Sequence, residues 1–183
     1  MKRAAGTYVR SQDGFTLIEV VIASALGAML MTALTSVLLT SVRAANIATS
    51  RIEASGQIRN FEFFAYDDFA RSSIPVSTPC APPSVACIDL TGTQMSNSTT
   101  PTPTYNYTVE YSWDGSSFLD RKVGGIVTHM ATNASSFSWY VDGTTAHPTV
   151  VVSLTVTIGN LSSFSGSYSQ SQTWKFEPRV NNP

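Results

Sequence analysis

Residues 14–23 of the chain read Gly-Phe-Thr-Leu-Ile-Glu-Val-Val-Ile-Ala and open a long apolar run. The run extends from Phe15 to about Val42, and Glu19 is its one ionisable residue. About 20 helical residues, at roughly 1.5 Å each, cross the hydrocarbon of a bilayer, so the run predicts a membrane-spanning helix. A carboxylate within such a helix costs about 2.5–3.5 kcal/mol on insertion scales, which makes Glu19 a candidate functional residue. The alternative is an ordinary anchor with an acid near the membrane interface.

The residues that flank this run carry a family resemblance. Gly14 is preceded by three basic residues, Lys2, Arg3 and Arg10, and followed by Phe-Thr-Leu-Ile-Glu. This arrangement resembles the leader and N-terminal helix of type IV prepilins, which include type IV pilins, type II secretion pseudopilins and related filament subunits. The resemblance implies that a prepilin peptidase cleaves after Gly14 and then methylates the new N-terminal amine, that of Phe15.

The same resemblance implies an assembly role for Glu19. In the family, the glutamate at this position is thought to pair with the N-terminal amine of a neighbouring subunit. The backbone groups of the helix that carries Glu19 are already hydrogen-bonded, so we expect no partner for the carboxylate in its own chain. An amine on Phe15 of an adjacent helix would neutralise it if the two helices were staggered by about one turn. Such a pair sets register more than it adds stability, because desolvation offsets much of the attraction.

Four segments are expected along the chain: a leader peptide at 1–14, a transmembrane and filament-core helix at 15–42, an amphipathic continuation of that helix at 43–71, and an exported globular domain at 72–183. Three basic residues precede the span, and Arg43 and Arg51 follow it. This modest excess favours a cytoplasmic N-terminus, a single pass through the inner membrane and an exported C-terminal domain.

Beyond the span, the sequence predicts an amphipathic helix that ends before Pro75. Its apolar residues recur at spacings near three and four, with one gap of six: Ala45, Ala48, Ile52, Ile58, Phe61, Ala65 and Phe69. The charged face is expected to hold Arg51, Glu53, Arg59, Glu62, Asp67 and Asp68. We also expect the aromatic cluster to form a core stripe against a sheet, through Phe61, Phe63, Phe64, Tyr66 and Phe69.

The sequence of residues 72–183 predicts an irregular segment followed by antiparallel strands. Residues 72–104 are rich in Ser, Thr and Pro and are expected to form a loop with one short strand at 88–90. The strands expected after it are 105–113, 118–123, 137–141, 149–158 and 172–177, with turns at Asp114-Gly115 and Asp142-Gly143. Residues 126–134 are ambiguous. The predicted fold is therefore α+β, a long helix followed by an antiparallel sheet, and it looks most like minor pilins and J-type pseudopilins.

Cys80 and Cys87 enclose six residues that include two prolines. In an exported domain this spacing favours a disulfide that closes a small loop. The alternative is a pair of free thiols in a loop. Two cysteines alone cannot supply the four ligands of a structural zinc site.

The residue patterns favour neither an enzyme nor a nucleic-acid-binding protein. His129 and His147 lack a metal ligand or a catalytic base at a recognised spacing, and the sequence has no phosphate-binding loop and no nucleophile elbow. We expect no cofactor and no metal. Without residues 1–14 the chain holds 8 basic and 11 acidic side chains, so it has no basic surface for nucleic acid.

Two functions remain open. In the first, the chain is a subunit of a type IV pilus or a type II secretion pseudopilus. Its partners are then other pilin or pseudopilin subunits, the prepilin peptidase and an inner-membrane assembly platform, and a separate ATPase drives assembly. In the second, it is a membrane-anchored binding module or adhesin, whose contacts would be exposed tryptophans, Trp113, Trp139 or Trp174.

Overall fold

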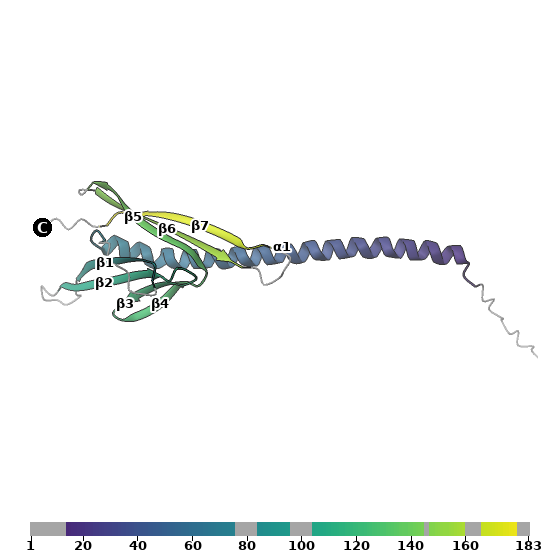
Figure 1. Cartoon of the computed structure of the whole chain (residues 1–183), viewed down its shortest axis with the longest axis horizontal. Helices are drawn as coiled ribbons and strands as arrows, with labels where there is room; N and C mark the ends of the chain where they lie inside the picture. Colours follow the sequence, from purple (N-terminus) through teal and green to yellow (C-terminus); the bar gives the residue numbers. More distant parts are fainter. Residues whose placement is uncertain (1–13, 76–83, 96–103, 145–146, 160–165, 179–183) are drawn as a thin grey trace, which may run out of the picture. The chain divides into compact units, whose positions relative to one another are not determined.

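A single helix dominates the N-terminal part of the fold. The fold is taken from a computed structural model that describes residues 14–75, 84–95, 104–144, 147–159 and 166–178. The helix, α1, runs from Leu17 to Arg71 and contains 55 residues (Figure 1). The chain forms two compact units, Met1–Ala44 and Ala45–Pro183, so α1 contributes residues to both.

In the N-terminal unit, every described residue from Gly14 to Ala44 is exposed. Most hydroxyl side chains of this segment are hydrogen-bonded within the helix. Hydroxyl groups donate to backbone carbonyls three or four residues earlier, as in Thr35 to Met31 and Thr40 to Ser36, both at 2.8 Å. These bonds lower the cost of placing hydroxyls in hydrocarbon. The segment is therefore suited to an apolar surrounding along its whole length.

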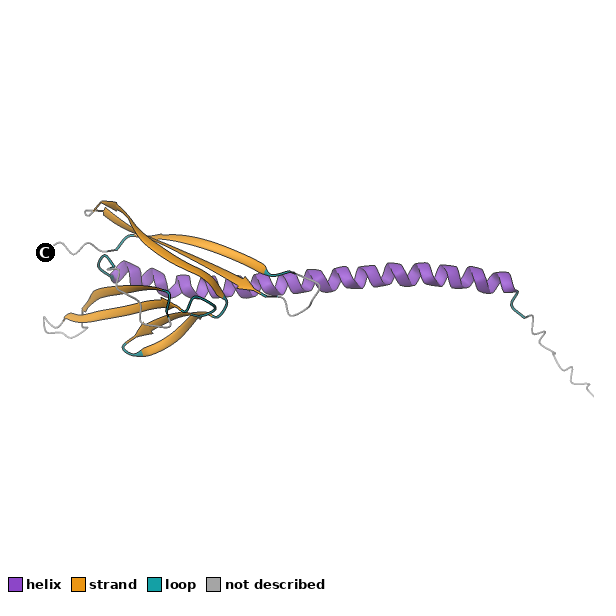
Figure 2. Cartoon of the chain, viewed as in Figure 1, coloured by secondary structure: helices purple, strands orange, loops and turns teal. Residues whose placement is uncertain are grey.

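The C-terminal unit contains two antiparallel sheets (Figure 2). Sheet A has four strands in sequence order: β1 (Ala86–Met95), β2 (Thr104–Trp113), β3 (Leu119–Val123) and β4 (Ile126–Ala131). Sheet B has three, also in sequence order: β5 (Ala134–Thr144), β6 (His147–Ile158) and β7 (Tyr168–Phe176). The predicted α+β fold with antiparallel strands is confirmed.

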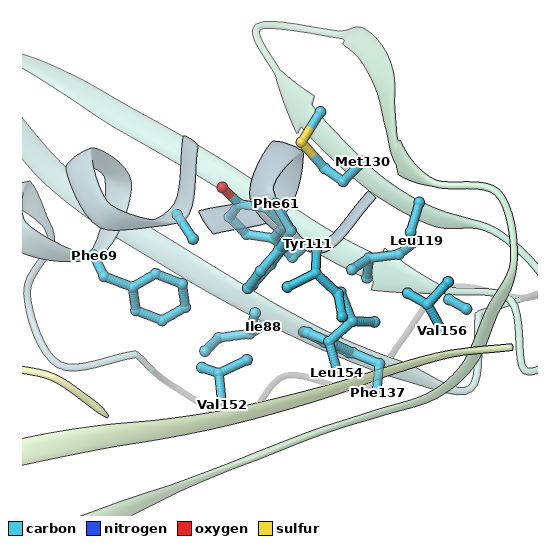
Figure 3. Close-up of a cluster of buried hydrophobic side chains, with 14 of the residues drawn as sticks. Phe61, Phe69, Ile88, Tyr111, Leu119, Met130, Phe137, Val152, Leu154 and Val156 are labelled. Carbon is cyan, nitrogen blue, oxygen red and sulfur yellow. The ribbon is translucent and has the colours of Figure 1, made fainter. Parts of the chain in front are cut away.

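Both sheets contribute side chains to one core against α1 (Figure 3). On the helix, the buried apolar residues are spaced three or four apart: Ala54, Ile58, Phe61, Ala65 and Phe69. From Val152 onward the buried residues of β6 alternate, because successive strand residues point to opposite faces, and Val152, Leu154 and Val156 are fully buried. Aromatic rings join the elements: Phe61 lies 5.5 Å from Tyr111, and Phe69 lies 4.4 Å from Phe176.

The predicted core stripe of α1 is partly wrong. Phe61 and Phe69 are buried, but Ile52, Phe63 and Tyr66 are 74%, 76% and 71% exposed. A helix turns by about 100° per residue, so the gap of six between Ile52 and Ile58 moves the second residue to a different face. Two apolar stripes therefore exist on this part of the helix. One faces the sheets, and the other faces away from them.

Four strand predictions also change. Strand β1 covers Ala86–Met95, so residues 91–95, expected in a loop, are part of sheet A. Of the ambiguous residues 126–134, Ile126–Ala131 form β4, after a tight turn at Gly124-Gly125, where both φ angles are positive. Strand β5 continues past the expected turn at Asp142-Gly143 to Thr144, and β7 begins earlier, at Tyr168. The hairpin around Asp114-Gly115 is as predicted.

The end of α1 is fastened to β1 through a close backbone contact. Ser73 N–H donates to the carbonyl of Thr91 at 2.7 Å, and Ser72 forms a bridge with Gly92. A Cβ on Gly92 would lie 2.6 Å from the carbonyl oxygen of Arg71. Only glycine fits at this crossing, which explains why the chain has no side chain there.

Gly92→Ala is expected to destabilise the protein by about 1–3 kcal/mol, because the backbone of Arg71 must move to accept the methyl group. Gly56→Ala is the matched control. Its Cβ would meet nothing within 4 Å, and alanine stabilises a helix interior by about 0.5–1 kcal/mol. Thermal denaturation of the detergent-solubilised chain, followed by tryptophan fluorescence, measures both. Equal melting of Gly92→Ala and the unaltered chain would contradict the contact.

Candidate functional site

The first turn of α1 holds the candidate assembly residue, Glu19. The helix begins at Leu17, and Thr16 precedes it as the N-cap residue. Thr16 N–H and Thr16 Oγ1 both donate to Glu19 Oε2 at 2.8 Å, while Glu19 N–H contacts Thr16 Oγ1 at 3.4 Å. This reciprocal arrangement is a capping box, which satisfies backbone donors that a helix leaves unpaired at its N-terminus.

The expectation that Glu19 has no partner in its own chain is therefore wrong. The pattern Thr-x-x-Glu before an apolar run is itself the sequence signal of a capping box, and it stands at residues 16–19. A negative charge in the first turn also interacts favourably with the helix dipole. Glu19 thus has a local role in starting the helix, whatever else it binds.

The capping box leaves part of the carboxylate available. Both hydrogen bonds end on Oε2, and within the described residues no hydrogen bond reaches Oε1. Glu19 is exposed, as is its neighbour Phe15. The remaining oxygen can accept a hydrogen bond from a cation outside this chain, such as an amine.

The expected processing residues lie directly before the helix. Gly14 and Phe15 precede the first helical residue and are exposed, so the peptide bond between them lies outside regular structure. A protease needs an accessible peptide bond, and the exposure of Gly14 and Phe15 is consistent with that. The basic residues of the leader lie outside the described residues.

The helix face that points away from the sheets is a second feature, and sequence analysis missed it. We call Ile52, Phe63 and Tyr66 the outer stripe. With about 100° per residue, these three lie within roughly 60° of one another around the helix. Arg59 lies on the same face of the helix, between Ile52 and Phe63 along the axis. The signal was present in the sequence as a second set of apolar residues with helical spacing.

Asp68 was expected on the charged face of the helix, but it is 1% exposed. Arg121 of β3 binds it with two hydrogen bonds, from Nε to Oδ2 at 2.6 Å and from Nη2 to Oδ1 at 2.8 Å. Tyr111 donates its hydroxyl to Oδ2 at 2.5 Å. Only Asp67 is on the solvent side, where it pairs with Arg71 at 2.7 Å. The pair Asp68–Arg121 joins α1 to sheet A and is structural.

The three tryptophans do not form an exposed binding platform. Trp113 Nε1 donates to the carbonyl of Ala134 at 3.0 Å, and Trp139 Nε1 donates to that of Cys87 at 2.7 Å. Trp174 lies 5.0 Å from the ring of Phe61. All three are partly buried against the core. The contacts expected for an adhesin are therefore elements of the fold.

The cysteines and histidines add no reactive group at the described positions. Cys87 is buried in β1, and its expected partner Cys80 lies outside the described residues, so the disulfide stays a prediction. His129 contacts Asp120 at 2.5 Å on the outer face of sheet A. Across the described ranges, no group of three or more His, Cys, Asp or Glu side chains could hold a metal ion.

Comparison with known proteins points to the N-terminal segment. A family model described as the prokaryotic N-terminal methylation motif matches residues 9–35. No curated protein and no solved structure shows significant similarity to the chain. By length and composition, α1 is the one described helix that could cross a membrane. The motif supports a type IV prepilin-like N-terminal segment, and α1 is long and apolar enough to anchor the chain by a single pass.

Proposed function

We propose that the chain is a minor pilin or pseudopilin, a structural subunit of a type IV pilus or a type II secretion pseudopilus that assembles through its N-terminal helix. The observation that carries this proposal is the methylation motif on an exposed apolar helix, with Glu19 as the fifth residue after Gly14. The motif implies other pilin subunits and the prepilin peptidase as partners. An inner-membrane platform and a separate ATPase complete the proposed machinery.

The geometry of Glu19 supports a contact between subunits. Its Oε2 is used by the capping box, and its Oε1 is turned to no donor within the described residues. After cleavage behind Gly14, each chain would begin with an amine on Phe15, one residue before the N-cap. The amine of a second helix, staggered by about one turn, would then meet Oε1 without breaking the capping box of the first.

The outer stripe also supports assembly. Phe63 and Tyr66 lie in the C-terminal unit, beyond the predicted span, yet both are largely exposed. Large apolar side chains grouped on one exposed face are typical of an interaction surface. A filament would cover them with neighbouring subunits.

We further propose that residues 72–183 are exported and that Cys80 and Cys87 form a disulfide there. Disulfides persist in oxidising compartments such as the periplasm. The single-pass anchor and the basic leader favour this orientation. The inner membrane is then the location before assembly, and the filament is the location after it.

Intact mass and N-terminal sequencing of the chain from its native membrane test the proposal. We expect a chain that begins at methylated Phe15 and is lighter than the fully reduced form by the mass of two hydrogen atoms. Gly14→Val should leave the leader uncleaved, because the peptidase is expected to require glycine before the cleaved bond. A wild-type chain that begins at Met1 with two free thiols would overturn both the processing and the export.

A further inference from the structure

Most of the outer face of sheet B is an array of hydroxyl groups, which ends at the row of Tyr140, Val151 and Lys175. Val152, Leu154 and Val156 of β6 point into the core, so the residues between them point outward. The register of β5 and β7 extends this face on both sides of β6. We call it the hydroxyl face; its members are Ser135, Ser136, Ser138, Ser153, Thr155, Thr157, Ser169, Ser171 and Thr173.

Neighbouring hydroxyls of this face are joined across the strands. Ser153 contacts Thr173 at 2.8 Å, Thr155 donates to Ser171 at 3.1 Å, and Thr157 lies 3.1 Å from Ser169. Ser135 extends the last pair through Thr157 at 2.8 Å. Each hydroxyl has one donor and two acceptor sites, so a pair that shares one bond keeps one donor and three acceptor sites for a ligand.

The nine residues of the hydroxyl face are all uncharged, and the charged residues on the same side of sheet B, Asp142 and Lys175, lie beyond them at the Tyr140 end. On sheet A, the corresponding outer face holds Asp89, Glu110, Asp120, Lys122 and His129, and Lys122 pairs with Glu110 at 3.3 Å. That is the usual composition of a solvated sheet face. The hydroxyl face lacks such charges over three strands, so low charge in the sequence as a whole does not account for the difference.

An exposed aromatic side chain borders the hydroxyl face. Tyr140 lies across from Val151 on the outer side of sheet B, next to the row that contains Ser138 and Ser153, and it is 59% exposed. A tyrosine ring offers an apolar surface and a polar tip. Hydroxyl groups beside an exposed ring suit a ligand that has both hydroxyls and C–H faces.

Rigidity strengthens such a surface. The sheet fixes the hydroxyls at roughly 4.8 Å between strands and about 6.7 Å between alternate residues along a strand. Threonine side chains are stiff at χ1, so little freedom is lost when they bind. A charged ligand would lose hydration here and find no opposite charge among the nine hydroxyl residues, because Asp142 and Lys175 lie outside them, at the Tyr140 end of the sheet. A neutral chain of repeated hydroxyl groups could contact several rows at once.

We propose that the hydroxyl face and Tyr140 bind an uncharged polysaccharide. This function is separate from subunit assembly, since it uses side chains on the opposite side of sheet B from the core and from α1. Repetition of the face along a filament would raise the overall affinity by multivalency. The binding itself is a property of the single chain.

Co-sedimentation of the full chain with insoluble polysaccharides tests the proposal. The chain is held in a detergent without a sugar headgroup, so that the detergent does not compete. Microcrystalline cellulose, chitin and insoluble amylose are the neutral probes, and calcium alginate beads are the anionic comparison. We expect retention on at least one neutral probe and none on alginate. Absence of retention on all three neutral probes, or equal retention on alginate, would overturn the proposal.

Variants locate the binding surface. The triple variant Ser153→Ala/Thr155→Val/Thr173→Val removes three central hydroxyls with nearly unchanged shape, and Tyr140→Ala removes the ring. Each is expected to weaken retention at least about tenfold, as the loss of several hydrogen bonds or of a large contact would. Thr108→Val on the exposed outer face of sheet A is the matched control and should bind normally. Unchanged retention by a triple variant that melts like the wild type would exclude the hydroxyl face.

Discussion

Glu19→Leu is expected to abolish incorporation of the chain into filaments and to leave the chain in the membrane. Leucine removes the carboxylate that we propose pairs with the Phe15 amine of a neighbour, and the amine would then be buried without a partner. Loss of one member of a buried ion pair costs about 3–5 kcal/mol, which corresponds to a loss of affinity between subunits of roughly 150- to 5,000-fold. The measurement is the ratio of this chain in sheared filaments to that in membranes.

Two further variants separate the charge of Glu19 from its capping role. Glu19→Gln keeps a residue that forms a capping box but removes the charge, whereas Thr16→Ala keeps the charge and removes the cap at a cost of about 1 kcal/mol. If the charge acts between subunits, Glu19→Gln fails to assemble and Thr16→Ala assembles. The reverse result would show that Glu19 serves only to start the helix. Assembly of Glu19→Leu itself would exclude the proposed pairing.

The helix and most strands could be predicted from the sequence because their signals are local. An apolar run that starts at Phe15 needs no knowledge of the rest of the chain, and the same holds for the alternation of β6. Strand β4 was ambiguous because exposed and buried residues do not alternate along it: its first four residues are exposed and its last two are buried. Its clearest signal was Gly124-Gly125, a pair that favours a two-residue hairpin turn.

Asp68 shows what a local pattern cannot reveal. The residue stands beside Asp67 near the end of a helix, where two carboxylates are ordinarily solvated. Its partner Arg121 lies 53 residues later in the sequence, on a strand that folds back against the same helix face. The outer stripe was missed for a related reason: counting apolar residues along α1 does not show which of them face a sheet. Only the tertiary arrangement divides those residues into two faces.

Asp68→Ala is expected to destabilise the C-terminal unit by about 3–5 kcal/mol, because it leaves the guanidinium of Arg121 largely buried without its carboxylate. The side chain of Arg121 is 16% exposed and that of Asp68 is 1% exposed. Burial, and then the adjacent carboxylate, raise the pKa of Tyr111, so its hydroxyl group stays protonated. In Asp68→Ala this hydroxyl group also loses its hydrogen-bond acceptor. Thermal denaturation monitored by near-ultraviolet circular dichroism gives the change in stability.

Two controls show whether this loss comes from an isolated buried charge. Asp67→Ala removes the exposed pair with Arg71 and should change stability by no more than about 1 kcal/mol. The double variant Asp68→Leu/Arg121→Met replaces both charges by apolar groups and should recover most of the stability, because buried pairs contribute little net energy once both desolvation costs are removed. If the double variant were as unstable as Asp68→Ala, the geometry of the hydrogen-bonded pair itself would be required to hold α1 against sheet A. The pair would then stabilise the fold through its specific bonds, and the cost of Asp68→Ala could not be assigned to an unpaired charge.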